Sequence, residues 1–332
     1  MAAGTTWRAT RVRTNETRLP RVVFDMEKRD RVLMVLSFLA IHIVWGSTYL
    51  GIRYAVETIP PLLTAGFRHV LGGAALFAWC WTQGHRPAAR QWRASLILSV
   101  MFFLVGHGLL HWAELVVPSG VAALLIAAEP VWVASLIALV DRRSRLSWSG
   151  IAGLVIGIIA VAVLVERPST LGTALFIGSI AVVLGGFSWS AGAVYARTAP
   201  LHPNPLMSSA MTLLCGGVLL TGASAITGSL AHFSIADVSA RSASALLYLT
   251  AFGAVTFVAY SWLLTRCSPV LVATHTYTNP IIAVILGAVL AGEHVTSRIV
   301  FSAAAVIVAI LLVGRDTQKE VVDSTEEAAV AS

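Results

Sequence analysis

The sequence predicts an all-α integral membrane protein whose ten transmembrane helices form two inverted five-helix repeats. Three observations predict it: the composition is strongly apolar, the apolar residues fall into ten long runs, and the two halves of the chain match each other. Hydrophobic residues make up 57% of the 332 residues and charged residues only 12%, about half the charged fraction of a soluble domain. No stretch within residues 32–314 is polar enough to cover a soluble domain, so the apolar excess is expected to face lipid.

Ten apolar runs are long enough to cross a bilayer, which takes roughly 17 to 25 helical residues for about 30 Å of hydrocarbon. Turn residues mark the short connections between them, as at Pro60-Pro61 and Pro203-Asn204-Pro205. The predicted spans are residues 32–52, 62–81, 94–112, 118–140, 148–165, 171–195, 206–226, 243–264, 269–291 and 297–314.

The two tails, residues 1–31 and 315–332, are too polar for a core and are expected to be disordered. A cleaved signal peptide is not expected, because the first apolar run is long enough to span and begins far into the chain. Met1 and Met26 are both candidate start residues.

The distribution of Lys and Arg predicts the orientation, because positively charged loops stay in the cytoplasm. With the N-terminus inside, eighteen basic residues fall on inner segments and four on outer segments, and Arg68 lies within a span. An even number of spans then places both tails in the cytoplasm. The outer four are Arg53, Arg167, Arg241 and Arg298.

The two halves of the chain match at fixed offsets, which predicts fused repeats over residues 32–165 and 171–314. Each repeat has five spans, an odd number, so the second repeat must cross the bilayer in the opposite sense to the first. An offset of 144 residues pairs Trp45 with Trp189, Arg53 with Arg197, Pro61 with Pro205 and Gly72-Gly73 with Gly216-Gly217, and an offset of 150 pairs Trp112 with Trp262, Ala123 with Ala273 and Pro130 with Pro280.

Ionisable residues inside the spans are the first candidates for function, because a buried unpaired charge is costly. Glu129 lies near the middle of the fourth span, and Pro130 beside it removes a helical hydrogen-bond donor. Its carboxyl group either takes up a proton or binds a substrate amine, or it is a structural partner of Arg68 on the second span. Asn279 and Pro280 predict an equivalent helix break in the second repeat.

Aromatic and histidine side chains are the remaining candidates for a central cavity. Trp45 and Trp189 either stack on an aromatic or cationic ligand or serve as symmetric packing anchors. His107 shares a helix face with His111 and Glu114, which fits cavity lining, packing at the interface or, least well, a metal site. The further candidates are His42, Tyr49, His275 and Tyr277.

Several motifs resemble one family of transporters, in order and over almost the whole of residues 32–314. They are Trp45-Gly46-Ser47-Thr48-Tyr49, Pro60-Pro61, Arg68, Val117-Pro118-Ser119-Gly120-Val121-Ala122-Ala123, Ser188-Trp189, Asn279-Pro280 and Gly292-Glu293. They resemble the EamA branch of the drug/metabolite transporter superfamily, and its YedA-type inner-membrane members in particular. The resemblance implies ten spans in two inverted repeats, a central cavity, a bacterial inner-membrane location and export of metabolites, amino-acid derivatives or toxic compounds. One feature departs from the family pattern, because Asp141-Arg142 stands where the family often has Gly-Glu.

The sequence therefore favours a secondary transporter that moves small molecules by alternating access, with protons as candidate coupling ions. A channel or facilitator and a lipid-handling scaffold are the alternatives. An enzyme is less favoured, because the chain contains no H-E-x-x-H, P-loop, dinucleotide or G-x-S-x-G motif. We expect no cofactor, no metal and no nucleic-acid partner. Gly153 and Gly157 permit close helix packing within a monomer or in a homodimer.

Overall fold

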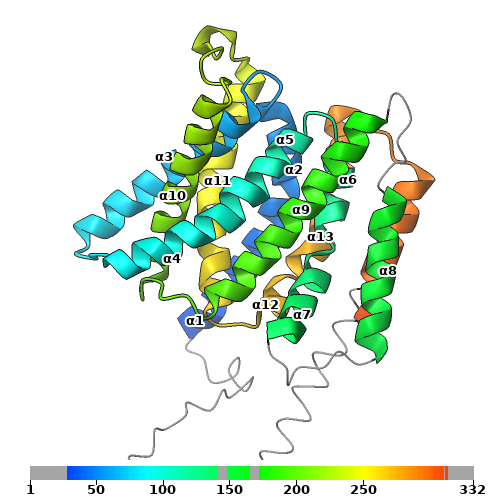
Figure 1. Ribbon diagram of the computed structural model, residues 1–332, viewed down its shortest axis with the longest axis horizontal. Helices are drawn as coiled ribbons and strands as arrows, with labels where there is room; N and C mark the ends of the chain where they lie inside the picture. Colours follow the sequence, from blue (N-terminus) through cyan, green and yellow to red (C-terminus); the bar gives the residue numbers. More distant parts are fainter. Residues whose placement is uncertain (1–27, 141–147, 165–171, 310, 313–332) are drawn as a thin grey trace, which may run out of the picture.

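The computed structural model describes residues 28–140, 148–164, 172–309 and 311–312, and within these residues it contains helices and no strand. The helices pack side by side in a bundle, with α8 (Trp148–Leu164) at one edge (Figure 1). The all-α fold predicted from the sequence is confirmed.

Three spans of the first half are not continuous α-helices, because each contains a change of helix type or a break. The elements of this half are α1 (Lys28–Leu39), η1 (Ala40–Val44), α2 (Trp45–Ala55), α3 (Pro61–Thr82), α4 (Ala89–Ser99), η2 (Val100–His107), α5 (Gly108–Ala113), α6 (Ser119–Ile126), α7 (Glu129–Val140) and α8. The second half contains α9 (Thr173–Ala196), α10 (Pro205–Ile226), the short η3 (Ile235–Asp237), α11 (Ala240–Leu264), α12 (Pro269–Val272), α13 (His275–Ala291) and a last helix, Ser297–Ala309.

Seven helical segments among the described residues are long and apolar enough to cross a membrane. Three shorter apolar helices, Trp148–Gly157, Thr278–Ala291 and Ser297–Ala309, lie where the remaining spans were predicted. Large apolar side chains are exposed along these helices, as expected for a lipid-facing surface. The multi-pass architecture is thus confirmed, while the number of ten spans stays a prediction.

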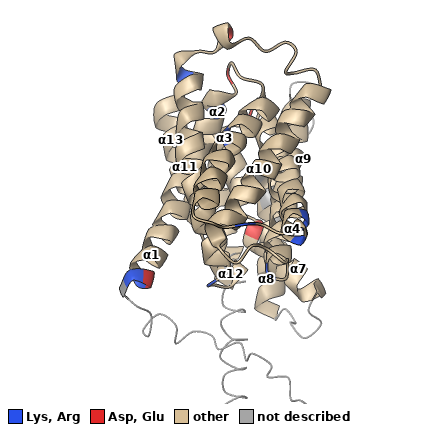
Figure 2. Ribbon diagram, turned by 90° about the vertical axis from the view of Figure 1, so that its left-hand side faces the viewer, with Lys and Arg blue, Asp and Glu red and all other residues tan. Residues whose placement is uncertain are grey.

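The two ends of the bundle differ in charge. We name them the Glu114 end, which carries the loops at 56–60, 114–118, 227–239 and 292–296, and the Arg197 end, which carries those at 83–88, 197–204 and 265–268. Most Lys and Arg residues that the structure describes lie at the Arg197 end, the lower end in Figure 2. They are Lys28, Arg29, Arg31, Arg86, Arg90, Arg93, Arg197 and Arg266, against Arg53, Arg241 and Arg298 at the opposite end.

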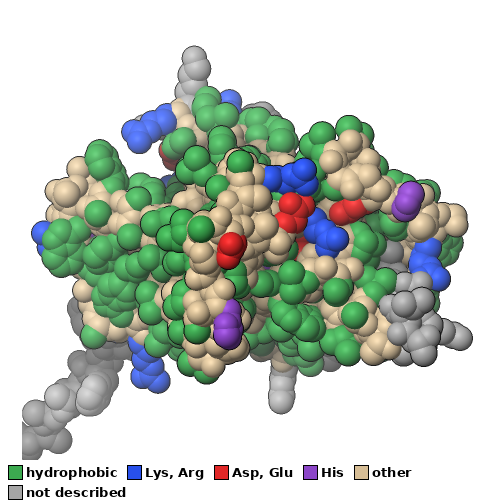
Figure 3. Space-filling view, turned by 90° about the horizontal axis from the view of Figure 1, so that it is seen from above, with side chains coloured by type: hydrophobic (Ala, Val, Ile, Leu, Met, Phe, Trp, Pro, Cys, Tyr) green, Lys and Arg blue, Asp and Glu red, His purple; other side chains and the backbone are tan. Residues whose placement is uncertain are grey.

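The Glu114 end combines an apolar surface with a few charged side chains. Figure 3 looks onto this end and shows charged side chains lying among apolar ones. Arg241 pairs with Glu57 at 3.3 Å, and both side chains are accessible to water. Such exposed pairs contribute little to stability.

The second span of each repeat begins with a proline, where the missing N–H group leaves no hydrogen bond unmade. Pro61 begins α3, and Pro205 begins α10 directly after Asn204, whose side-chain oxygen accepts a hydrogen bond from the Met207 N–H group at 3.2 Å. The two helices then pack in close contact along their length. The second spans of the two predicted repeats, α3 and α10, therefore begin in the same way and pack against each other.

Glycines allow α3 and α10 to approach so closely. A Cβ atom at Gly73 would lie 2.6 Å from the backbone nitrogen of Leu214, and one at Gly217 would lie 2.6 Å from Cγ2 of Val70. Neither distance is tolerated by real side chains, so this contact requires glycine on both helices.

The fourth span of each repeat is broken, but at different positions along the span. In the first half the break lies at Ala127 and Ala128, so Glu129 begins α7 and Pro130 occupies a first-turn position that suits proline. In the second half it lies at Ala273 and Thr274, and Pro280 is inside α13. The break expected at Pro280 therefore comes about one helical turn earlier.

Two other spans contain π-helical turns, which widen the helix and leave backbone groups for other partners. The first span contains η1 and the third contains η2. Within η2, the carbonyl group of Met101 accepts a hydrogen bond from the Ser188 hydroxyl at 2.9 Å. Gly106 and Gly185 bring η2 and α9 into backbone contact at the same level. Both turns contain side chains buried in the core, Ile41 in η1 and Phe103 in η2.

A carboxylate joins the two repeats at the Glu114 end. Gly292 ends α13 in the left-handed conformation, at φ 66°, and the Glu293 N–H group donates to the carbonyl group of Gly287 at 3.0 Å. The side chain of Glu293 then accepts hydrogen bonds from the Ser119 N–H and hydroxyl groups, both at 2.9 Å, and from the Gly120 N–H group at 3.3 Å. A negative charge at the N-terminus of α6 is stabilising. We name this contact the Glu293 clamp.

Gly157 on α8 packs within the chain. A Cβ atom at this position would lie 3.2 Å from Val131 and 3.5 Å from Ala309, which belong to α7 and the last helix. The close packing expected for the G-x-x-x-G step is therefore used inside one chain at Gly157. The choice between a monomer and a homodimer stays open as a prediction.

Candidate functional site

A narrow cavity lies in the centre of the bundle, with a volume of about 60 Å³. Sites for drug-sized ligands have volumes of roughly 300 to 1,000 Å³. The structure therefore shows a constricted state, and anything larger than a few atoms requires the helices to move apart. Eight of the residues predicted from the sequence line this cavity, namely Trp45, Tyr49, Arg68, His107, Glu129, Trp189, His275 and Asn279.

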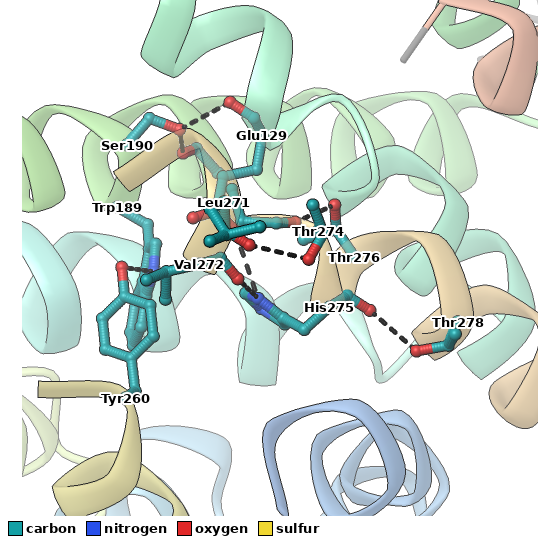
Figure 4. A network of polar contacts seen from close by, with 12 residues as sticks. Glu129, Trp189, Ser190, Tyr260, Leu271, Val272, Thr274, His275, Thr276 and Thr278 are labelled. Atoms are coloured by element: carbon teal, nitrogen blue, oxygen red, sulfur yellow. Dashed lines mark hydrogen bonds and ion pairs between the residues drawn. The ribbon is translucent and has the colours of Figure 1, made fainter. Parts of the chain in front are cut away.

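Aromatic rings form one wall of the cavity. The rings of Trp45 and Trp189 meet edge to face with centroids 5.7 Å apart, and the ring of His107 stacks on Trp189 at 5.0 Å. The indole N–H group of Trp189 donates to the Tyr260 hydroxyl at 3.1 Å (Figure 4). In this state the two tryptophans pack against each other. Their role, as packing anchors or as a platform for a ligand, stays a prediction.

Glu129 brings a carboxyl group to the cavity at the start of α7. Its side chain is 3% exposed, and its Oε2 atom lies 4.0 Å from Nε2 of His275, the first residue of α13. The Ser190 hydroxyl donates to the carbonyl group of Gly186 at 2.9 Å and approaches the Glu129 carbonyl group at 3.5 Å (Figure 4). The two broken spans thus meet through their first residues after the break.

Arg68 enters the cavity from α3 and is 4% exposed. Its Nη2 atom lies 3.2 Å from Nδ1 of His107, and its Nε–H group donates to Nε2 of His69 at 3.4 Å. Within the described residues, the Nη1 group has no hydrogen-bond partner, and no ion pair joins Arg68 to Glu129. The structural interpretation of Glu129 as the counter-charge of Arg68 is therefore not supported, and one face of the guanidinium remains available.

The other predicted residues differ in their positions. Asn279 is 2% exposed, lines the cavity and has no hydrogen-bond partner for its Oδ1 atom among the described residues. His42 does not line the cavity, and its Nδ1 atom bonds to the Phe38 carbonyl group at 2.8 Å. Neither Pro130 nor Pro280 lines it. The side chain of Tyr277 lies outside the described part of the structure.

A larger space opens at the Arg197 end, with a volume of about 500 Å³. We name it the vestibule, and Arg197, Arg266 and His202 are among its lining residues. Phe102 separates it from the central cavity, since this ring lines the vestibule and packs against Trp189 with centroids 4.5 Å apart. The ring of Phe102 therefore lies between the central cavity and the vestibule at the Arg197 end.

The chain matches the EamA-like transporter family twice, over residues 32–166 and 176–315. The chain belongs to the EamA-like transporter family. The resemblance noted in its motifs is thus confirmed, and the protein is a multi-pass membrane transporter with the two-repeat EamA fold.

Relatives of this EamA-like transporter cover most of its length. It is 36% identical to the uncharacterized inner membrane transporter YedA of Escherichia coli K12, over 86% of this chain and 92% of YedA. It is 29% identical to a probable amino-acid metabolite efflux pump of Salmonella typhimurium, over 82% of this chain and 90% of that protein. One solved crystal structure has the same fold, with a TM-score of 0.61 at 17% identity over 85% of this chain and 97% of that chain.

Some residues at the site of this EamA-like transporter escaped the sequence reasoning. His69 is buried between Arg68 and His107, and Tyr260 holds the indole of Trp189. A signal existed for each: His69 follows an intramembrane arginine, and a tyrosine hydroxyl within an apolar span needs a partner. In the described residues, no group of three or more His, Cys, Asp or Glu side chains is arranged to hold a metal ion.

Proposed function

We propose that this chain is a secondary transporter that exports small metabolites and toxic compounds, amino-acid derivatives among them, by alternating access with protons coupled at Glu129. The observation that carries the proposal is that Glu129 and Arg68 line one constricted cavity without pairing with each other. Opposite charges held apart in a low-dielectric site attract a ligand that carries both.

The polar groups of the cavity suit a zwitterionic substrate. The free Nη1 group of Arg68 can donate to a carboxylate, and the Glu129 carboxyl group with the free Oδ1 atom of Asn279 can accept from an ammonium group. Trp45 and Trp189 supply flat apolar surfaces for a side chain. The relative described as an amino-acid metabolite efflux pump supports the same substrate class.

Alternating access is favoured over an open pore by the two ends of the bundle. At the Glu114 end, the Glu293 clamp holds α13 to α6, and the Arg53 side chain donates to the backbone carbonyl group of Glu114. At the Arg197 end, the vestibule reaches the Phe102 ring beside the site. These contacts thus hold the Glu114 end together, whereas one aromatic ring lies between the site and the vestibule at the Arg197 end. Such a difference between the two ends is expected for a gated transporter.

Export is tested by metabolite profiling of cells with and without the gene. We expect the ratio of intracellular to extracellular substrate to rise when the gene is deleted, and the accumulated compounds to carry both an amino group and a carboxylate. Mass spectrometry of cells and medium measures this ratio. Complementation with the wild type and with Glu57→Gln, a change at an exposed pair, should restore it. Equal ratios with and without the gene would reject export, and a fall in the ratio would reverse its direction.

We further propose that the Arg197 end faces the cytoplasm, as the excess of Lys and Arg at that end favours. Reporter fusions after Arg143 and after Lys319 should then report the cytoplasm, and fusions after Arg53 and within residues 227–242 the outside. A reversed signal at all four positions would overturn the orientation. Reversal at a single position would instead move one span boundary.

A further inference from the structure

A row of buried polar side chains continues from the cavity toward the Glu114 end. His107 ends η2, His111 follows on α5, and Glu114 follows directly after α5. Residues three and four positions apart share one face of a helix. His111 and Glu114 are both 0% exposed, so this face carries ionisable groups where an apolar interior is the rule.

The outer two groups of this row each have side-chain atoms that make no hydrogen bond among the described residues. The Nδ1 atom of His111 bonds to the carbonyl group of His107 at 2.8 Å, which leaves Nε2 as the free ring nitrogen. Within the described residues, neither this Nε2 atom nor either carboxyl oxygen of Glu114 has a hydrogen-bond partner. A buried carboxyl group without partners costs several kcal/mol, so packing alone gives no reason for it.

The inner end of the row reaches the cavity. The Nδ1 atom of His107 lies 2.9 Å from Nε2 of His69 and 3.2 Å from Nη2 of Arg68. The rings of His107 and His111 have centroids 5.7 Å apart, a separation that one water molecule or one rotamer change bridges. His107 lines the same cavity as Glu129. The inner end of the row therefore opens into the cavity that holds the carboxyl group assigned to coupling.

Charged and titratable groups face the row from α2, from α3 and from the end of α13. Arg53 and Tyr49 face Glu114 from α2, Arg68 faces it from α3, and Glu293 faces it from the end of α13. Arg68 also lies beside His69, His107 and His111. The fixed positive charge of Arg68 therefore lies beside both rings of the row.

We propose that Glu114, His111 and His107 form a proton path between the Glu114 end of the bundle and Glu129. The path rests on the proposed coupling role of Glu129. A proton from water protonates the Glu114 carboxylate, passes to Nε2 of His111 and then through His107 to the Glu129 carboxylate. The proton that Nε2 of His111 takes up leaves from the same atom after the ring turns toward His107, so each donor returns to its starting state and one proton has moved with no other bond changed.

The path is tested by following the protonation of Glu129 in proteoliposomes that hold the full chain in one orientation. The probe is the proton itself, applied as a pH step on the side of the Glu114 end. The infrared carbonyl band of the protonated carboxyl group is assigned by its loss in Glu129→Gln. We expect the band to respond at least about tenfold more slowly in Glu114→Gln and in His111→Gln, because positioned acid–base groups contribute factors of this size or more.

Matched variants separate the path from general effects. Glu57→Gln and His232→Gln make the same changes at exposed positions of the same end and should keep the wild-type rate. Glu114→Asp keeps a titratable carboxyl group and should respond faster than Glu114→Gln, which separates loss of the proton carrier from a folding defect.

Three outcomes would overturn the proposal. Wild-type rates in both Glu114→Gln and His111→Gln would remove the path and leave the coupling role of Glu129 intact. A faster response to a pH step at the Arg197 end would place proton uptake on the other side. A Glu129 band that responds from neither side would reject the coupling role as well.

Discussion

Glu129→Gln is expected to abolish transport driven by a pH gradient while leaving a folded protein that still exchanges substrate. The change keeps the size of the side chain and removes its titratable proton. The rate of gradient-driven accumulation in proteoliposomes should fall by roughly two orders of magnitude or more, the contribution of a positioned proton carrier. Exchange of labelled substrate without a gradient measures the remaining cycle, and it should continue.

The fold should survive this substitution because of the contacts that the structure gives to the buried charges. Arg68 contacts His69 and His107 and makes no described ion pair with Glu129, so the change does not strand a buried arginine. Glu57→Gln, at an exposed pair, is the matched control. Normal gradient-driven transport by a folded Glu129→Gln variant would exclude the coupling role, and loss of folded protein would favour a structural one.

Gly73→Ala is expected to destabilise the protein strongly, whereas Gly222→Ala is expected to be neutral or stabilising. At Gly73 the new methyl group would lie 2.6 Å from the Leu214 nitrogen and 3.0 Å from the Leu213 carbonyl carbon, so α3 and α10 must separate. Overpacking of this kind costs about 1 to 3 kcal/mol. At Gly222, also on α10, nothing lies within 4 Å, and alanine favours the helix by up to about 1 kcal/mol.

Thermal unfolding of the purified variants in detergent, followed by the loss of monodisperse protein, measures both changes. Gly217→Ala should behave like Gly73→Ala, because its methyl group would meet Val70 across the same contact. Similar melting temperatures for Gly73→Ala and Gly222→Ala would show that α3 and α10 do not pack in this way.

The sequence predicted the membrane fold and most of the cavity lining for the same physical reason. Spans must be apolar, so a charged residue such as Glu129 or Arg68 within one stands out and must face other protein groups. His42 is also a polar residue within a span, yet it does not line the cavity, and the sequence pattern does not distinguish these two outcomes.

The helix breaks show where the sequence pattern stops being informative. A proline marks a missing hydrogen-bond donor, yet Pro130 sits at a helix start and Pro280 inside a helix. Because the second break comes a turn earlier, His275 and not Asn279 begins its helix opposite Glu129. The position of each break along its span decides which carboxyl, ring or amide groups meet at the centre. Tertiary packing sets that position.

The Glu293 clamp has a consequence for the balance between the two conformations of the bundle. Its three hydrogen bonds join the two repeats at the Glu114 end in this structure, and the first repeat has Asp141-Arg142 at the place where its own glutamate would stand. Two identical halves would hold both faces shut with equal strength and populate both conformers equally. A fused chain is free of that symmetry, and each 1.4 kcal/mol of difference between its gates shifts the ratio of conformers about tenfold. If the proposed alternating access holds, we expect the resting molecule to be biased toward loading from the Arg197 end, with reopening at the Glu114 end as the step that substrate and protons must drive.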